Sequence, residues 1–206
     1  AKAQKRYENS GIRQRYFSES FDTYNVETAE QEELITVVKA YLSEIQAGNW
    51  KTLVLLGNAG TGKTHLSTSV IREIVKTVKS NAYGLAGFMS AHYFESADIV
   101  DEVRKGESFR FSKTASSLID NFTCYDLLVI DEIGRTSSEA EKQVLFRVFN
   151  ALYNTRKSSI LIGNFANRKA FYEYMGGAFV DRLAESGVVY ETKGKSYRIN
   201  NSRKGA

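Results

Sequence analysis

The fold of this chain is decided by the stretch Gly57-Asn58-Ala59-Gly60-Thr61-Gly62-Lys63-Thr64. It matches the pattern G-x-x-x-x-G-K-[ST], in which a glycine-rich loop lets backbone N–H groups wrap around phosphates. The apolar run 52–56 precedes it, and apolar residues four positions apart follow it, at Leu66, Val70, Ile74 and Val78. That spacing predicts a helix of about four turns, so a buried strand, a loop and a helix follow one another. We therefore predict a P-loop that binds ATP.

Each part of this loop has an expected role in binding ATP and Mg²⁺. The loop amides and the N-terminus of the following helix offer donors and positive potential to phosphate oxygens. We expect the Lys63 ammonium to reach the β- and γ-phosphates and the Thr64 hydroxyl to ligate Mg²⁺. The predicted nucleotide-binding residues of this segment are Gly57, Asn58, Ala59, Gly60, Thr61, Gly62, Lys63, Thr64 and His65.

Two adjacent carboxylates end a second apolar run. Leu127-Leu128-Val129-Ile130 is typical of a strand buried on both faces of a parallel sheet, and Asp131 and Glu132 follow it directly. Ligands bind at the carboxyl edge of such sheets. Asp131 is expected to hold Mg²⁺, and Glu132 to polarise the water that attacks the γ-phosphate.

A third apolar run, Ile160-Leu161-Ile162, ends in Gly163-Asn164. If this strand lies beside the other two, Asn164 can orient water near the γ-phosphate. An arginine is also expected, because a guanidinium stabilises the charge that develops during phosphoryl transfer. The candidates are Arg168, Arg182 and Arg198, and their spacing in the sequence does not choose among them.

The remaining patterns predict an α/β fold with a mainly parallel sheet, because strands and helices alternate. We expect helices over 28–47, 90–105 and around 144–153, and a helical stretch over 167–185. Weaker strands are expected at 85–89, 188–190 and 196–199, and residues 1–20 read as irregular. Thr28 and Gln31 have the spacing of a capping box at the start of the first helix.

Length and composition exclude several classes of protein. The 206 residues suggest one domain, and no apolar run approaches the ~18 residues that span a membrane, so no membrane partner is expected. The single cysteine, Cys124, fits a reducing cytoplasm. Basic residues gather at both ends, over 1–16 and 193–206. Such ends indicate either nucleic-acid contact or solvated tails.

A basic and aromatic segment spans residues 104–113. It interleaves charge with rings, and its candidate DNA contacts are Arg104, Lys105, Phe109, Arg110, Phe111 and Lys113. Such a loop neutralises phosphates and stacks bases. The alternative is a solvated helix end with its two aromatic rings folded into the core.

The ordered motifs resemble those of the AAA+ ATPases, and most closely the DnaC group of bacterial and phage replicative-helicase loaders, which is related to DnaA and to IstB-type transposition helpers. The resemblance runs from about residue 10 to residue 199. It is carried by Ser10-Gly11-Ile12-Arg13, Ser20-Phe21-Asp22-Thr23-Tyr24, the P-loop with His65-Leu66, the block 126–134 and Ser196-Tyr197-Arg198.

The resemblance implies a three-layer P-loop core whose lid domain is absent or rudimentary. Residues 1–27 would then be an N-terminal extension on the adenine side, and residues 28–206 the ATPase domain. Asn164 resembles sensor 1, Arg198 resembles sensor 2, and Arg182 falls where the family holds its arginine finger. Phe21 and Tyr24 lie where the family covers adenine. Segment 104–113 matches the place where loaders touch single-stranded DNA.

The implied function is a slow ATPase that binds single-stranded DNA, assembles head-to-tail and loads a hexameric replicative helicase. Two alternatives stay open, namely an IstB-type transposition helper and a nucleotide-gated scaffold with little turnover. Two departures from the loader pattern stand out. Ala178 occupies a place where DnaC proteins often have an arginine, and there is no room ahead of residue 10 for a helicase-binding domain.

Overall fold

A five-stranded parallel sheet forms the centre of the protein. The computed structural model describes residues 2–80, 84–108, 115–136 and 138–194. The strand order is β4-β5-β6-β1-β7, and every neighbouring pair is parallel. The strands are β1 (Thr52–Gly57), β4 (Ala91–Glu95), β5 (Leu127–Ile133), β6 (Ser158–Gly163) and β7 (Gly187–Thr192).

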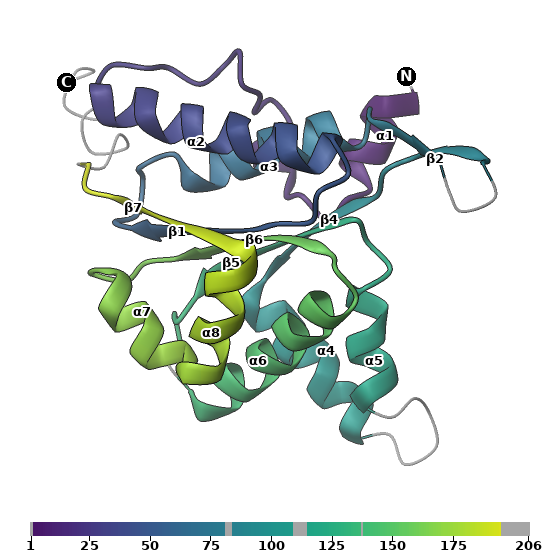
Figure 1. Ribbon diagram of the computed structural model, residues 1–206, viewed down its shortest axis with the longest axis vertical. Coiled ribbons are helices and arrows are strands. Elements are labelled where there is room, and N and C mark those ends of the chain that lie inside the picture. The colour runs from purple at the N-terminus through teal and green to yellow at the C-terminus, as the bar shows by residue number, and fades with distance from the viewer. Residues whose placement is uncertain (1, 81–83, 109–114, 137, 195–206) are drawn as a thin grey trace.

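Helices cover both faces of this sheet and make three layers (Figure 1). On one face lie α1 (Lys2–Glu8), α2 (Ala29–Gln46) and α3 (Lys63–Ile74), with a short 3₁₀ turn, η1, at Gln14–Tyr16. On the other face lie α4 (Ser96–Ser108), α5 (Ala115–Phe122), α6 (Glu139–Asn154), α7 (Arg168–Met175) and α8 (Gly177–Ser186). The predicted α/β class with a mainly parallel sheet is confirmed.

The two cores follow from the alternation of side chains along each strand. In β1, Leu53 and Leu55 pack into the core beneath α2 and α3, while Val54 and Leu56 pack into the core beneath α4 to α8. All four side chains are fully buried. A strand buried on both faces needs a continuous apolar run, which is why 52–56 and 127–130 are so uniform.

The helix expected over 28–47 is confirmed as α2. The Thr28 side chain accepts from the Gln31 backbone N–H at 3.3 Å, and the Gln31 side chain accepts from the Thr28 N–H at 3.0 Å. This reciprocal pair is a capping box, which satisfies two N–H groups that the helix leaves without partners. Gly48 follows the helix end at a positive φ of 88°.

The segment between α3 and α4 differs from its prediction. Helix α3 ends at Ile74, and Val78 lies 59% exposed in a hairpin of β2 (Val78–Ser80) and β3 (Ala86–Phe88). Residues 91–95, expected in a helix, form the edge strand β4. The reason is tertiary, because β4 pairs in register with β5 and alternately buries Ala91, Tyr93 and Glu95.

Three further expectations are corrected. Residues 1–20 are not irregular throughout, since α1 and η1 form there and bury Tyr7 and Tyr16 against α3 and β4. Helix α5 was not expected at all. The stretch 167–185 divides into α7 and α8 at Gly176, whose φ of 85° breaks the helix. The strand expected over 196–199 lies outside the described residues.

Asp126, the residue before β5, holds the ends of several strands together. Its carboxylate accepts from the Ser90 N–H at 2.8 Å, and its other oxygen lies 2.5 Å from Lys79 Nζ and 3.6 Å from Lys157 Nζ. Burial raises the pKa of Asp126, but the hydrogen bond from Lys79 and the other contacts outweigh it and lower the pKa overall. This charged cluster fixes the start of β5 relative to β4 and β6.

The strand order positions the site. Strand β6 lies between β1 and β5, so the residues that end these three strands meet at one edge of the sheet. The register of β5 against β6 shifts between Ile130 and Ile133, which is a β-bulge. Bulges re-aim side chains near functional sites, and this one contains Asp131 and Glu132.

Candidate nucleotide-binding site

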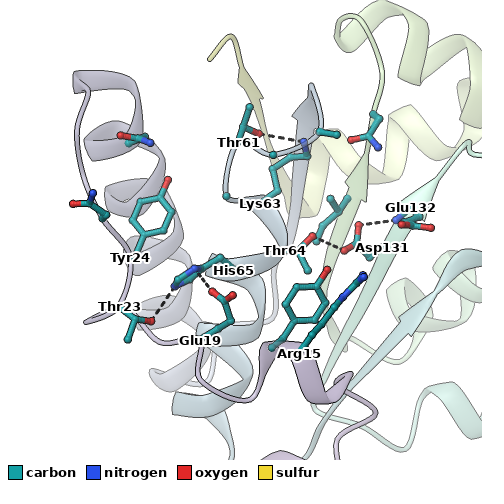
Figure 2. A pocket seen from close by; sticks show the side chains of 18 residues that line it. Arg15, Glu19, Thr23, Tyr24, Thr61, Lys63, Thr64, His65, Asp131 and Glu132 are labelled. Atoms are coloured by element: carbon teal, nitrogen blue, oxygen red, sulfur yellow. Dashed lines mark hydrogen bonds and ion pairs between the residues drawn. The ribbon is translucent and has the colours of Figure 1, made fainter. Parts of the chain in front are cut away.

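A cavity of about 340 Å³ opens at the carboxyl edge of the sheet. Its wall combines the P-loop, the ends of β5 and β6, and the N-terminal segment 15–25 (Figure 2). The predicted residues Lys63, Thr64, Asp131, Glu132 and Asn164 all line it. Its volume is in the range of small-ligand pockets, about 300–1,000 Å³.

Close contacts require glycine at both ends of the P-loop, at Gly57 and at Gly62. Gly57 has a φ of 120°, and a side chain there would collide with the Thr192 carbonyl on β7. Gly62 has a φ of 91°, and a Cβ there would lie 2.6 Å from the Tyr24 ring. Only glycine adopts such angles without strain, and its bare backbone can approach a phosphate closely.

The Lys63 ammonium lies at the centre of the loop. It donates to the carbonyl oxygens of Gly57 at 2.8 Å and Asn58 at 2.6 Å, and to Thr61 Oγ1 at 3.3 Å. The residue is only 4% exposed. A buried ammonium held by loop carbonyls is placed where phosphate oxygens approach the loop amides.

A pair of oxygen donors suited to Mg²⁺ joins α3 to β5. Thr64 Oγ1 donates to Asp131 Oδ2 at 2.7 Å, and the Tyr93 hydroxyl donates to the same oxygen at 2.9 Å. Mg²⁺ prefers hard oxygen ligands, and takes few from protein when a phosphate supplies others. The described residues contain no larger cluster of potential metal ligands. This hydroxyl and carboxylate therefore fit the metal that accompanies ATP.

Glu132 lies in a strained backbone conformation. Its φ is 60°, which is unusual for a residue with a side chain. The Ser96 hydroxyl donates to its carbonyl oxygen at 3.0 Å, and Arg135 forms an ion pair with its carboxylate. Strain of this kind persists only where neighbours enforce it, and it is concentrated at functional sites.

Glu141, which the sequence did not single out, holds the loop after β5. Its carboxylate is buried and accepts from Ser96 Oγ at 2.8 Å, from the Gly134 N–H at 3.3 Å and from Thr136. These contacts connect α6 to the turn that follows Glu132. A lone glutamate near the start of an amphipathic helix carries no sequence signal for such a role.

The two aromatics that the resemblance assigned to covering adenine, Phe21 and Tyr24, differ in position. Tyr24 lines the cavity and packs edge-on against His65, with ring centroids 5.2 Å apart. Phe21 does not line it and packs in the core beneath the Lys39 ammonium. Burial raises the pKa of the Tyr24 hydroxyl to about 12.

His65 ties the N-terminal segment to α3. Its Nδ1 forms an ion pair with Glu19, and its Nε2 lies 2.8 Å from the Ser20 carbonyl oxygen. Burial lowers the pKa of His65, but the hydrogen bonds to Glu19 and Ser20 outweigh it and raise the pKa. The Thr23 hydroxyl, 3.3 Å from Nε2, is a third partner that can donate or accept.

The other predicted residues lie away from the cavity or outside the described residues. Arg182 is on α8, where it donates to the Ala178 carbonyl oxygen at 2.8 Å and lies over the rings of Phe146 and Tyr153. Arg168 pairs with Glu191 at 3.1 Å. Arg104 and Lys105 are exposed on α4. Outside the described residues lie Arg198, Phe109, Arg110, Phe111 and Lys113.

Arg15 is a cavity residue that the sequence did not single out for the site. It lines the cavity from η1, although it was counted only as part of a basic end. Arg15 was not among the arginines that the sequence offered for the γ-phosphate, which were Arg168, Arg182 and Arg198. Its place inside the segment that carries the resemblance was a possible signal, but only the tertiary structure brings it to the site.

Comparison with known proteins agrees with this geometry. The family described as IstB-like ATP binding protein matches residues 12–205. The chain belongs to this family. Among curated relatives, it is 28% identical to the replicative helicase loader DnaC of Escherichia coli K12, over 88% of this chain and 69% of that protein. It is 27% identical to DnaC of Buchnera aphidicola subsp. Schizaphis graminum, over 84% of this chain and 66% of that protein.

Solved structures show the same fold. The chain superposes on the crystal structure of the DnaC helicase loader with a TM-score of 0.69 at 18% identity, covering 88% of this chain and 100% of that one. DnaI gives 0.68 at 15% identity, covering 93% and 98%. AMPPCP-bound DnaA from Aquifex aeolicus gives 0.64 at 20% identity, covering 94% and 55%. The fold is that of the AAA+ P-loop ATPases. No described helix is long and apolar enough to cross a membrane.

The contact between Gly62 and Tyr24 predicts the effect of Gly62→Ala. The new methyl group would displace the Tyr24 ring and strain the loop, so affinity for ATP should fall by at least about tenfold, which corresponds to about 1.4 kcal/mol. Isothermal titration calorimetry measures this. Gly48→Ala is the matched control, because Gly48 has a similar φ of 88° but no atom lies within 4 Å of the place that its new methyl group would take. Both variants strain a backbone of positive φ, but only Gly62→Ala adds a clash, so equal ATP affinities would contradict the prediction.

Proposed function

We propose that this protein is a slow, Mg²⁺-dependent ATPase that acts as a helicase loader in DNA replication. The observation that carries the ATPase assignment is the meeting of Lys63, Thr64, Asp131, Glu132 and Asn164 in one cavity. They come from the carboxyl ends of two strands, β5 and β6, and from the N-terminus of α3. The names of the DnaC relatives support the loader assignment. With its single cysteine, the chain is expected to act in the reducing cytoplasm.

The arrangement supports a division of labour among the side chains. The loop amides and Lys63 would bind the β- and γ-phosphates, while Thr64 and Asp131 would hold Mg²⁺, which supplies charge neutralisation when bound. Asn164 would orient the attacking water, and the Glu132 carboxylate would accept a hydrogen bond from it. Tyr24 and the loop residues Asn58 to Thr61 would enclose the rest of the nucleotide.

Assembly and DNA binding form the second part of the proposal. Arg182 lies outside its own subunit's cavity, so it would act as the arginine finger of a neighbour. A head-to-tail interface of this kind makes rings or open helices. One protein of similar fold is DnaA bound to AMPPCP and single-stranded DNA, which supports a DNA-binding role for this chain. Its basic and aromatic composition makes segment 104–113 the candidate surface.

Two other functions stay as alternatives. The family that this chain belongs to is named for IstB, so an IstB-type helper of transposition is the first. A nucleotide-gated scaffold with little turnover is the second. Pull-down of the protein from its host separates the first from a loader, since recovery of a transposase would exclude loading. Steady-state ATP turnover, measured with and without single-stranded DNA, separates the scaffold from an ATPase, since the scaffold would show little turnover in either case.

Exchange of the proposed water-polarising carboxylate tests the ATPase assignment. Glu132→Gln should keep ATP affinity within about twofold and lose at least about 100-fold in turnover, because binding rests on Lys63 and the loop amides. Lys63→Ala should weaken both. Phosphate release and calorimetry measure the two quantities. Glu139→Gln is the matched control, because Glu139 begins α6 and does not line the cavity. Unchanged turnover in Glu132→Gln would exclude its role.

Arginine substitution tests the head-to-tail assembly. Arg182→Ala should leave ATP binding by the single subunit intact but abolish the ATP-dependent rise in mass and turnover, because the neighbour's γ-phosphate loses its cation. Light scattering with ATP, Mg²⁺ and single-stranded DNA measures the mass. Arg168→Ala is the comparison, since this arginine already pairs with Glu191. A wild-type protein that stays monomeric under these conditions would refute the assembly.

Charge removal in segment 104–113 tests DNA binding. Replacing Arg104, Lys105, Arg110 and Lys113 with alanine should weaken single-stranded DNA binding and flatten its salt dependence, by about 0.7 in the log–log slope per lost phosphate contact. Fluorescence anisotropy across a salt series measures it. Alanine at Lys142 and Lys169, on α6 and α7, provides a control that should leave the slope unchanged. An unaltered slope in the segment variant would place DNA binding elsewhere.

A further inference from the structure

The N-terminal segment 10–16 is anchored to the edge strand of the sheet. The Ser10 carbonyl oxygen accepts from the Tyr93 N–H at 2.8 Å, and Ile12 is buried in the core. Arg13 then pairs with Glu95, the last residue of β4, at 2.5 Å. Glu95 lies in register with Asp131 on β5, so the segment reaches the same sheet edge as the cavity.

The chain that follows is anchored to the P-loop helix. Arg72 on α3 donates to the carbonyl oxygens of Glu19 at 2.8 Å and Phe17 at 2.5 Å, and its guanidinium lies 4.0 Å from the Tyr7 ring centroid. The Tyr7 hydroxyl donates to the Tyr16 carbonyl oxygen at 3.0 Å. The turn η1 is therefore held on both sides by buried or charged contacts.

Arg15 lies between these anchors and faces the cavity. Figure 2 shows its side chain extending from η1 toward the end of β5, where Asp131 and Glu132 lie. Its guanidinium is 4.6 Å from the ring centroid of Tyr16, and no ion pair of Arg15 is found among the described residues. The Tyr16 ring and the anchored turn η1 thus orient the Arg15 guanidinium.

The nearby carboxylates already have other partners. Asp131 accepts from Thr64 and Tyr93, Glu132 pairs with Arg135, and Glu95 pairs with Arg13. A guanidinium that lines the cavity without pairing with these carboxylates is suited to an anion that enters it. Guanidinium groups bind phosphate through two parallel hydrogen bonds, and such charge-assisted bonds are strong.

The position of Arg15 along the cavity indicates which phosphate of ATP it would contact. Tyr24 and His65 border the side expected to take the base, whereas Asp131 and Glu132 border the side expected to take the γ-phosphate (Figure 2). Arg15 extends toward the second side. We propose that Arg15 binds the terminal phosphate of ATP in its own subunit, so that the N-terminal segment distinguishes ATP from ADP. This inference rests on the proposed function.

Differential nucleotide affinity tests the inference. Arg15→Ala should raise the Kd for an imido analogue of ATP about tenfold or more, because a hydrogen bond to a charged group is lost. The Kd for ADP should change by less than about twofold, since ADP lacks the phosphate that Arg15 contacts. Calorimetry with Mg²⁺ measures both, at a protein concentration where light scattering shows single subunits, so that no neighbour's arginine contributes.

Two companion variants separate a phosphate contact from loss of the segment's structure. Gln14→Ala changes the same turn at a residue outside the cavity, and should leave both affinities unchanged. Arg15→Lys keeps a charge without the planar fork, and should recover part of the affinity for the analogue. If Arg15→Ala weakens analogue and ADP equally, or weakens neither, the inference is overturned while the ATPase assignment stands. If the unaltered protein binds neither nucleotide, the proposed function itself fails.

Discussion

The hydrogen bond from Thr64 to Asp131 joins the P-loop helix α3 to strand β5. The rest of the cavity depends on the strand order that brings these two residues together. Thr64 lies in the first turn of α3, which follows β1 through the P-loop, and Asp131 lies near the carboxyl end of β5. Strands β1 and β5 are not neighbours in the sheet. Strand β6 separates them, so the side chains can meet only where all three strands end. The same spacing places Asn164 between the P-loop and Glu132 and leaves room for a triphosphate.

The conformation of Glu132 has a matching structural cause. A bulge in β5 removes Asp131 and Glu132 from regular pairing with β6, and the backbone then turns through a positive φ. Ser96, the first residue of α4, and Glu141 from α6 both contact this turn, the first at the Glu132 carbonyl and the second at the Gly134 amide. The strained position is therefore held by contacts from two helices, α4 and α6, and such strain persists only where neighbours enforce it.

The N-terminal segment is part of the site and not an appendage to it. Tyr7, Ile12 and Tyr16 are buried in the core that α2, α3 and the sheet share. His65 and Arg72 on the P-loop helix hold residues 17–20 by ion pair and hydrogen bonds. Because of these contacts, a movement of α3 on exchange of the nucleotide would also move this segment. The proposed contact of Arg15 with the nucleotide would then be coupled to α3.

The sequence by itself determined the class of fold and the residues that end its three central strands. The P-loop, the Asp131-Glu132 pair and Asn164 follow apolar runs, and such runs report double-sided burial without any knowledge of neighbours. Helix α2 was equally readable, because its capping box and apolar face are local features.

Only the tertiary structure decided the rest, because it depends on contacts between residues distant in the chain. Residues 91–95 carry aromatic side chains that suit a helix or a strand, and pairing with β5 selects the strand. Val78 continues the four-residue spacing of apolar residues in α3, but it lies in β2 and pairs with Phe88 of β3. Arg15 reads as one charge of a basic end, and it reaches the cavity only because Ser10, Arg13 and Arg72 anchor the turn that carries it.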